Sequence, residues 1–178
     1  MKDGKFRKWN RSELTYSIQN YNPRLREDLQ VTAIRWAFDL WSSPTSFQFK
    51  RIKDGIAADI ELRWEARQIA EPAWANPPPS SSGQLPHDGN IWFNLERRWT
   101  FETRDTQEEP LDFLTLCAHE IGHSIGLDHI MADTLMRSPY SGSIRRLGLY
   151  ELSCYTQLYE QHLECSFFPN EASGIYCP

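Results

Sequence analysis

The sequence has no long hydrophobic run, few cysteines and no excess of basic residues. A membrane-spanning helix needs about 20 consecutive, mainly apolar residues, and no segment approaches that length, so we expect no membrane span. The net charge of −5 argues against nucleic acid as the main partner, because phosphate backbones are bound by basic patches. The four cysteines are compatible with disulfides because their number is even, but their spacing matches no zinc-finger pattern.

The composition is that of an ordinary globular protein, 40% hydrophobic and 24% charged over 178 residues. This length predicts one domain with room for an appendage. Apolar and polar residues alternate in four segments, which predicts strands with one buried face: 13–18, 46–52, 58–64 and 90–95. Prolines and serines crowd segment 76–86, which predicts a loop.

Apolar residues at helical spacing predict three helices. Asn22 can cap the first helix, Pro23 suits its first turn and Pro44 ends it. Pro110 opens the second, and the third covers 147–161. The buried stripes are Val31, Ile34, Phe38 and Trp41 on the first helix, and Leu114, Ala118, Ile121 and Ile125 on the second. This order of elements predicts an α+β fold with helices packed on one twisted sheet.

The segment HEIGHSIGLDH, residues 119–129, holds three of the five histidines. His119 and His123 lie four residues apart on the second predicted helix, about 40° apart around its axis, so both imidazoles can reach one ion. Gly126 tolerates left-handed backbone angles, so the helix can end there and the chain can turn. The turn brings His129 back as a third nitrogen ligand. Three histidines with an open fourth position predict a catalytic zinc site.

Glu120 lies close enough to touch a water on that ion without ligating it. Zinc lowers the pKa of a bound water to about 7, and a glutamate can take the proton as general base, which predicts amide hydrolysis. The alternative is a set of ordinary, partly buried histidines, because the bare pattern His-Glu-x-x-His also occurs by chance. The glycine, the third histidine and the helical periodicity favour zinc.

A sharp turn with a methionine is expected beneath such a site. Met131 and Met136 are the candidates, and Met136, seven residues past His129, is our choice. The alternative is that Met136 is simply a core residue.

At this point the chain resembles the metzincins, and within them the catalytic domain of the matrix metalloproteinases, or matrixins. The resemblance covers about residues 9–160 and extends beyond the zinc motif. It includes KW at 8–9 with LTYSI, then AIRWAFDLWS, ADIELRW and WFNLERRW, and finally TLM and SPY in the segment after the histidines.

The resemblance implies a twisted, mainly parallel five-stranded sheet with three helices. A catalytic domain would cover 1–161, with a cleft between an N-terminal subdomain of about 1–126 and a smaller one from 127. A cysteine-containing tail, 162–178, would pack on it.

The resemblance also implies roles for individual residues. His119, His123 and His129 would be the zinc ligands, with Glu120 as the catalytic base. The S1′ pocket, which takes the substrate side chain that follows the scissile bond, would be lined by Pro139 and Tyr140, with Thr115 near its floor. The substrate would lie extended along an edge strand near Ala73–Ala75, paired through its backbone.

The chain also departs from the family pattern. The family usually has serine after the third histidine, where this chain has Ile130, and its acidic pair on the last helix falls on Tyr150 and Glu151. The loop that holds structural zinc and calcium in the relatives shrinks here to EARQIAEP, and the ligand positions on the fifth strand fall on Trp92, Asn94 and Arg97. We therefore expect one catalytic zinc and no structural zinc or calcium. His87, Asp88 and Glu96 remain as candidate ligands for an unrelated site.

Two disulfides are expected. Cys165 and Cys177 are close together in the irregular tail, where a bridge would replace a missing core. Cys117 and Cys154 would meet because their helices pack closely in the family fold.

The predicted function is a secreted, monomeric zinc endopeptidase that acts on proteins or peptides and is a target for protein inhibitors. Two alternatives remain: a catalytically silent binding module with the same fold, and an intracellular metzincin whose cysteines are reduced or bind another metal.

Overall fold

The computed structural model describes residues 7–81, 83, 85–131 and 133–160. It is built on one five-stranded sheet, with β1 (Glu13–Ile18), β2 (Gln48–Arg51), β3 (Ile60–Glu65), β4 (Ala73–Ala75) and β5 (Ile91–Asn94) in the order β2-β1-β3-β5-β4. All neighbours in the sheet are parallel except β4, which runs antiparallel to β5 and forms one edge. The expected α+β fold with a mainly parallel sheet is confirmed.

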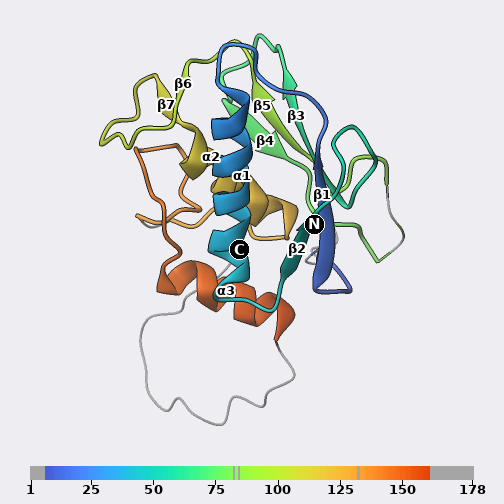
Figure 1. Cartoon of the computed structure of the whole chain (residues 1–178). Helices are drawn as coiled ribbons and strands as arrows, with labels where there is room; N and C mark the ends of the chain where they lie inside the picture. The colour runs from blue at the N-terminus through green and yellow to red at the C-terminus, as the bar shows by residue number, and fades with distance from the viewer. Residues whose placement is uncertain (1–6, 82, 84, 132, 161–178) are drawn as a thin grey trace.

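Three helices complete the fold: α1 (Glu27–Ser42), α2 (Phe113–Ser124) and α3 (Leu149–Tyr159). Figure 1 shows α1 and α2 side by side against the sheet, with α3 across their lower end. The indole of Trp41 on α1 donates a hydrogen bond to the carbonyl of Ala118 on α2 at 2.8 Å, inside the core. No helix within the described ranges is long and apolar enough to cross a membrane.

The first helix begins at Glu27 rather than near Pro23, so the expected cap at Asn22 is wrong. The reason is a competing local structure. The Asn22 side chain accepts from the Arg24 N–H at 2.9 Å, while the Gln30 amide both donates to the Asn22 carbonyl and accepts from its N–H. These bonds satisfy the polar groups of a turn ahead of the helix.

The start of α2 also differs from the prediction, because the chain after Pro110 first forms a strand. That strand, β7 (Leu111–Asp112), pairs in parallel with β6 (Trp99–Thr100), and neither was predicted. Asp112 then caps α2 by accepting from the Leu114 N–H at 3.1 Å. The helix that carries the histidines is thus held from its first residue against the loop between β6 and β7.

The expected Cys117–Cys154 bridge is wrong. Cys117 is a free thiol, fully buried on α2, and burial raises its pKa. Cys154 is disulfide-bonded, but not to Cys117. The expected Cys165–Cys177 bridge also lies outside the described residues.

The N-terminal segment packs against the end of α2. The buried indole of Trp9 donates to the Ser124 carbonyl at 2.9 Å, and the Trp9 N–H donates to the hydroxyl of Tyr159. Gly126 sits directly beneath this segment with φ +99°, and a Cβ on it would lie 2.3 Å from the Arg7 carbonyl oxygen. Both the backbone angle and the close approach therefore require glycine.

Replacing Gly126 tests this constraint. Gly126→Ala should lower the free energy of unfolding by about 3 kcal/mol, because it combines left-handed strain with a backbone clash. Gly55→Ala is the matched control: Gly55 has φ +75° but open space around its Cβ position, so about 1 kcal/mol is expected. Urea unfolding measures both, and equal losses would show that the contact with Arg7 has no effect.

Candidate metal centre

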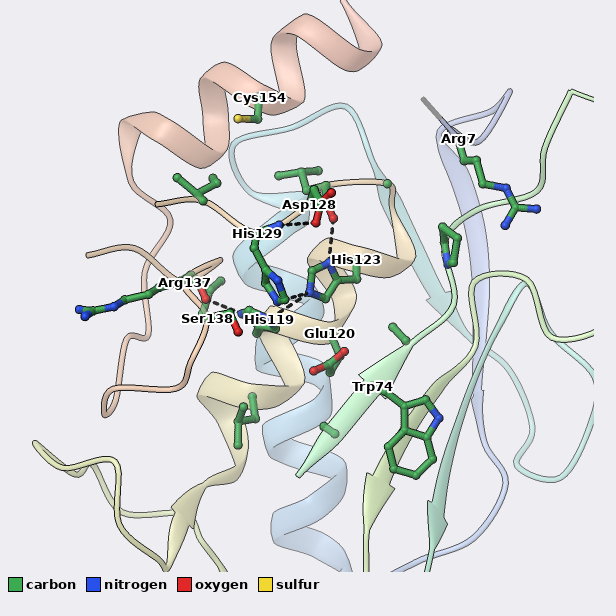
Figure 2. Close-up of a pocket in the computed structure, with 18 of the residues that line it drawn as sticks. Arg7, Trp74, His119, Glu120, His123, Asp128, His129, Arg137, Ser138 and Cys154 are labelled. Carbon is green, nitrogen blue, oxygen red and sulfur yellow. Dashed lines mark hydrogen bonds between the residues drawn. The ribbon is translucent and has the colours of Figure 1, made fainter. Parts of the chain in front are cut away.

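The two ends of the histidine motif come from different kinds of structure. His119 and His123 lie on α2, whereas His129 lies in the loop that follows Gly126. The helix ends through hydrogen bonds from the Gly126 N–H to the His123 carbonyl and from the Leu127 N–H to the Gly122 carbonyl. This turn returns the chain toward the helix, and Figure 2 shows the three imidazoles converging.

The imidazole nitrogens are spaced as ligands of one small ion. The Nε2 atom of His123 is 3.0 Å from that of His119 and 3.1 Å from that of His129. Three nitrogens on a zinc tetrahedron with bonds of 2.0–2.1 Å would be about 3.3 Å apart. Among the described residues, these three histidines are the only group of at least three potential ligands that lie together. The residues therefore fit zinc.

Hydrogen bonds select the tautomer that a metal needs. His119 donates through Nδ1 to the Leu135 carbonyl at 2.7 Å, and His123 donates through Nδ1 to the Leu127 carbonyl at 2.8 Å. With the proton on Nδ1, the lone pair of each Nε2 points into the shared space. Burial also lowers the pKa of His119 to about 3 and that of His123 below its usual value. Both imidazoles are thus held neutral, which is the form that binds metal.

Glu120 is buried beside the triad, with only 4% of its surface exposed. Its Oε2 atom has no hydrogen-bond partner, and burial raises the pKa of the carboxyl to about 8. Figure 2 shows the side chain on the side of α2 that faces β4. A cation at the triad would supply the missing positive charge and lower this pKa again. An unpartnered buried carboxyl at this place is a cost to folding that a purely structural residue would not require.

The methionine chosen from the sequence lies beneath the helix that bears the ligands. Met136 is fully buried, and its Sδ atom is so close to Gly122 that a Cβ there would approach it to 2.3 Å. Its carbonyl accepts from the Ile130 N–H, next to the third histidine. Met131, in contrast, is 99% exposed. Met136 thus packs against the helix that bears two of the histidines, and its role as the methionine turn stays a prediction.

One wall of the cleft is the free edge of β4. The Pro72 carbonyl accepts from the Asn94 N–H, and the Asn76 N–H donates to the Asn90 carbonyl just before β5, so alternate residues of β4 face β5. The N–H and C=O groups of Ala73 and Ala75 consequently face away from the sheet. β4 lines the same cleft as His119, Glu120 and His123, and it offers these groups to an extended chain.

The expected pocket residues, Thr115, Pro139 and Tyr140, all line this cleft. Two of them, Thr115 and Tyr140, are held in place by Asp112, a residue that the sequence did not lead us to expect in the site. Asp112 accepts from the Thr115 hydroxyl at 2.6 Å, and its N–H donates to the Tyr140 hydroxyl at 3.2 Å. Arg145 was missed as well, and it pairs with Asp112 at 2.8 Å. An aspartate just before a helical stripe is a capping signal that could have identified Asp112; nothing in the sequence marks Arg145.

The candidates for an unrelated metal site do not come together in the described part of the chain. Asp88 is buried and pairs with Arg7 at 3.4 Å and with the Leu85 N–H at 2.6 Å. The Nδ1 atom of His87 lies 3.3 Å from the Asn90 amide nitrogen. The carboxylate is therefore occupied by Arg7 and the Leu85 N–H, and this ring nitrogen lies against Asn90 of its own loop.

Comparison with known proteins identifies relatives over most of the chain. The family model described as Matrixin matches residues 8–159. Matrix metalloproteinase-C of Caenorhabditis elegans is 31% identical over 140 residues, 75% of this chain and 24% of that protein. Karilysin of Tannerella forsythia is 30% identical over 149 residues, 78% of this chain and 30% of that protein. Human neutrophil collagenase is 35% identical over 130 residues, 68% of this chain and 26% of that protein.

The chain therefore spans roughly a quarter to a third of the length of these relatives. The matched region includes every described strand and helix and the whole histidine motif. The chain belongs to the matrixin family.

Proposed function

We propose that this protein is a zinc-dependent endopeptidase. The observation that carries the proposal is the convergence of three Nε2 atoms beside a buried, unpartnered carboxyl, in a cleft bordered by a free strand edge. His119, His123 and His129 would hold zinc, which when bound lowers the pKa of water to about 7 and polarises a carbonyl. Glu120 takes the proton of the attacking water and returns it to the leaving nitrogen.

The substrate is an extended polypeptide. Its backbone pairs with the N–H and C=O groups of Ala73 and Ala75, which adds a strand to the sheet. The side chain after the scissile bond, P1′, enters the pocket with Thr115, Pro139 and Tyr140. The cleft then separates a larger N-terminal part, up to about residue 126, from a smaller part after it.

Removal of the general base tests the proposal. Glu120→Gln keeps the shape of the side chain and should leave zinc bound, but it should reduce kcat/KM for peptide cleavage by about 10²–10⁴-fold. Glu71→Gln, at an exposed position on the rim of the same cleft, is the matched control and should cleave normally. Near wild-type turnover by zinc-loaded Glu120→Gln protein would exclude this mechanism.

We also propose that the domain holds a single zinc and no structural zinc or calcium. Trp92 stands at the position of a ligand in the relatives. Its ring stacks on that of Trp74, with 6.0 Å between the ring centroids, and the Arg67 guanidinium lies over the Trp74 ring. The Asn94 amide is engaged by the Arg67 N–H and carbonyl and by the Glu71 carbonyl. Arg97 pairs with Glu109 at 2.7 Å. Calcium needs oxygen ligands. At these three positions the side chains are instead engaged in ring stacking, hydrogen bonds and an ion pair.

Metal analysis of the dialysed protein tests this count. About one zinc per chain and no calcium are expected, because only the triad offers a set of zinc ligands among the described residues. Thermal unfolding with and without a calcium-selective chelator is the companion measurement and should give the same midpoint. About two zincs per chain, or a clear loss of stability on removing calcium, would contradict the proposal.

We further propose that the protein is secreted and monomeric, with protein inhibitors as additional partners. The disulfide at Cys154 favours an oxidising compartment over the cytosol. The alternative of a silent binding module is disfavoured by Glu120, since loss of that glutamate is the simplest route to inactivity.

Thiol titration separates the secreted protein from an intracellular one. In denaturant, the number of reactive thiols should increase when the protein is first reduced, and the buried Cys117 should react without reduction. The test uses protein purified from its natural source. If reduction leaves the number of reactive thiols unchanged, the intracellular alternative is supported.

A further inference from the structure

The segment that forms the outer wall of the substrate pocket belongs to no strand or helix. We call residues 138–145 the specificity loop. It contains Pro139 and Tyr140, and it is held in place by hydrogen bonds to two other parts of the chain rather than by a regular element. Ser143 is bonded in both directions to the backbone of Arg104, at 2.6 and 2.7 Å, and the Ile144 N–H donates to the Thr115 hydroxyl at 3.0 Å.

The loop ends on an ion pair between a partly exposed arginine and a buried aspartate. The Asp112 side chain is completely buried, and Arg145 reaches it with two hydrogen bonds, Nε to Oδ2 at 2.9 Å and Nη2 to Oδ1 at 2.8 Å. The same Nη2 donates to the Phe101 carbonyl at 2.7 Å. A bidentate, charge-assisted pair is both stronger and more directional than the neutral bonds along the rest of the loop. Arg145 is therefore the firmest attachment of the specificity loop.

Asp112 connects this attachment to the catalytic helix and to the pocket. It caps α2 through the Leu114 N–H, accepts from the Thr115 hydroxyl, and donates its own N–H to the Tyr140 hydroxyl. One residue thus fixes the floor and wall residues and the end of the loop relative to α2: its carboxylate binds Thr115 and Arg145, and its backbone N–H binds Tyr140.

We propose that the Arg145–Asp112 ion pair sets the size of the P1′ side chain that the pocket accepts, by holding the specificity loop against the start of α2. This inference rests on the proposed function. Arg145 does not line the substrate cleft, so it is a positioning residue. Its charge is balanced by Asp112, so the pair offers the pocket no net charge and selects by space rather than by charge.

The geometry indicates the direction of the selection. The Ile144 N–H donates to the Thr115 hydroxyl at 3.0 Å, and both residues line the cleft. With Thr115 at the floor of the proposed pocket, this bond closes the space beside it, so a long P1′ side chain would have to break the bond, whereas a side chain of leucine size would not. Closure of the loop by Arg145 therefore disfavours long P1′ side chains, and release of the loop should admit them.

The test uses two peptides that differ only at P1′, one with leucine and one with the longer biphenylalanine. In zinc-loaded Arg145→Ala protein, the ratio of kcat/KM for leucine over biphenylalanine should fall by about tenfold, the scale on which pocket shape discriminates side chains. Arg146→Ala is the matched control, because the adjacent Arg146 is exposed, and its ratio should stay that of the wild type. Arg145→Lys, which keeps the charge but loses the bidentate geometry, should give an intermediate ratio.

The outcomes separate the inference from the proposed function. If the wild-type protein cleaves neither these peptides nor a broad peptide library, the proposed function fails. If it cleaves them and Arg145→Ala leaves the ratio unchanged, or Arg146→Ala changes it equally, the positioning role is overturned. A loss of activity for both peptides in the same proportion also overturns it, since that is the result of general destabilisation. Should Arg145→Ala not fold, the ratio of Arg145→Lys decides by the same criteria.

Discussion

Two backbone carbonyls hold the site together. The carbonyls of Leu127 and Leu135 accept the Nδ1 protons of His123 and His119, and this alone leaves both Nε2 lone pairs directed at one point. Each carbonyl is placed by a turn: one by the sharp end of α2 at Gly126, the other by the turn around Met136. The rest of the fold holds these two turns against α2.

The same arrangement carries a cost that the rest of the structure offsets. The buried Oε2 atom of Glu120 has no hydrogen-bond partner, which is unfavourable unless a cation at the neighbouring triad offsets it. The helix that bears them is therefore surrounded by firm contacts: the Trp41 indole on its backbone, the Trp9 indole at its end and the Asp112 cap at its start. These contacts along α2 offset the cost of the unpartnered carboxyl oxygen.

The parts that followed from the sequence are those governed by local periodicity. Alternation located β1, β2, β3 and β5, and helical spacing located three helices, because burial of one face constrains neighbouring residues in a regular way. The starts of α1 and α2 were misplaced because Gln30 and Asp112 bond to residues that a helical pattern does not reveal. The Cys117–Cys154 bridge was wrong for a related reason: proximity of two helices does not bring two particular sulfur atoms together.

The sequence by itself determined which three histidines converge, which carboxyl lies beside them and where the helix turns, since all lie within eleven residues whose geometry a helix and one turn fix. It also determined the choice of Met136, through its distance along the chain from His129. Only the tertiary structure decided which groups hold these residues in place. Asp112 and Arg145 are far apart in sequence and meet because the β6–β7 loop, the start of α2 and the specificity loop pack on one another. Because the pair depends on the packing of three separate segments, no pattern of residues within one segment reveals it.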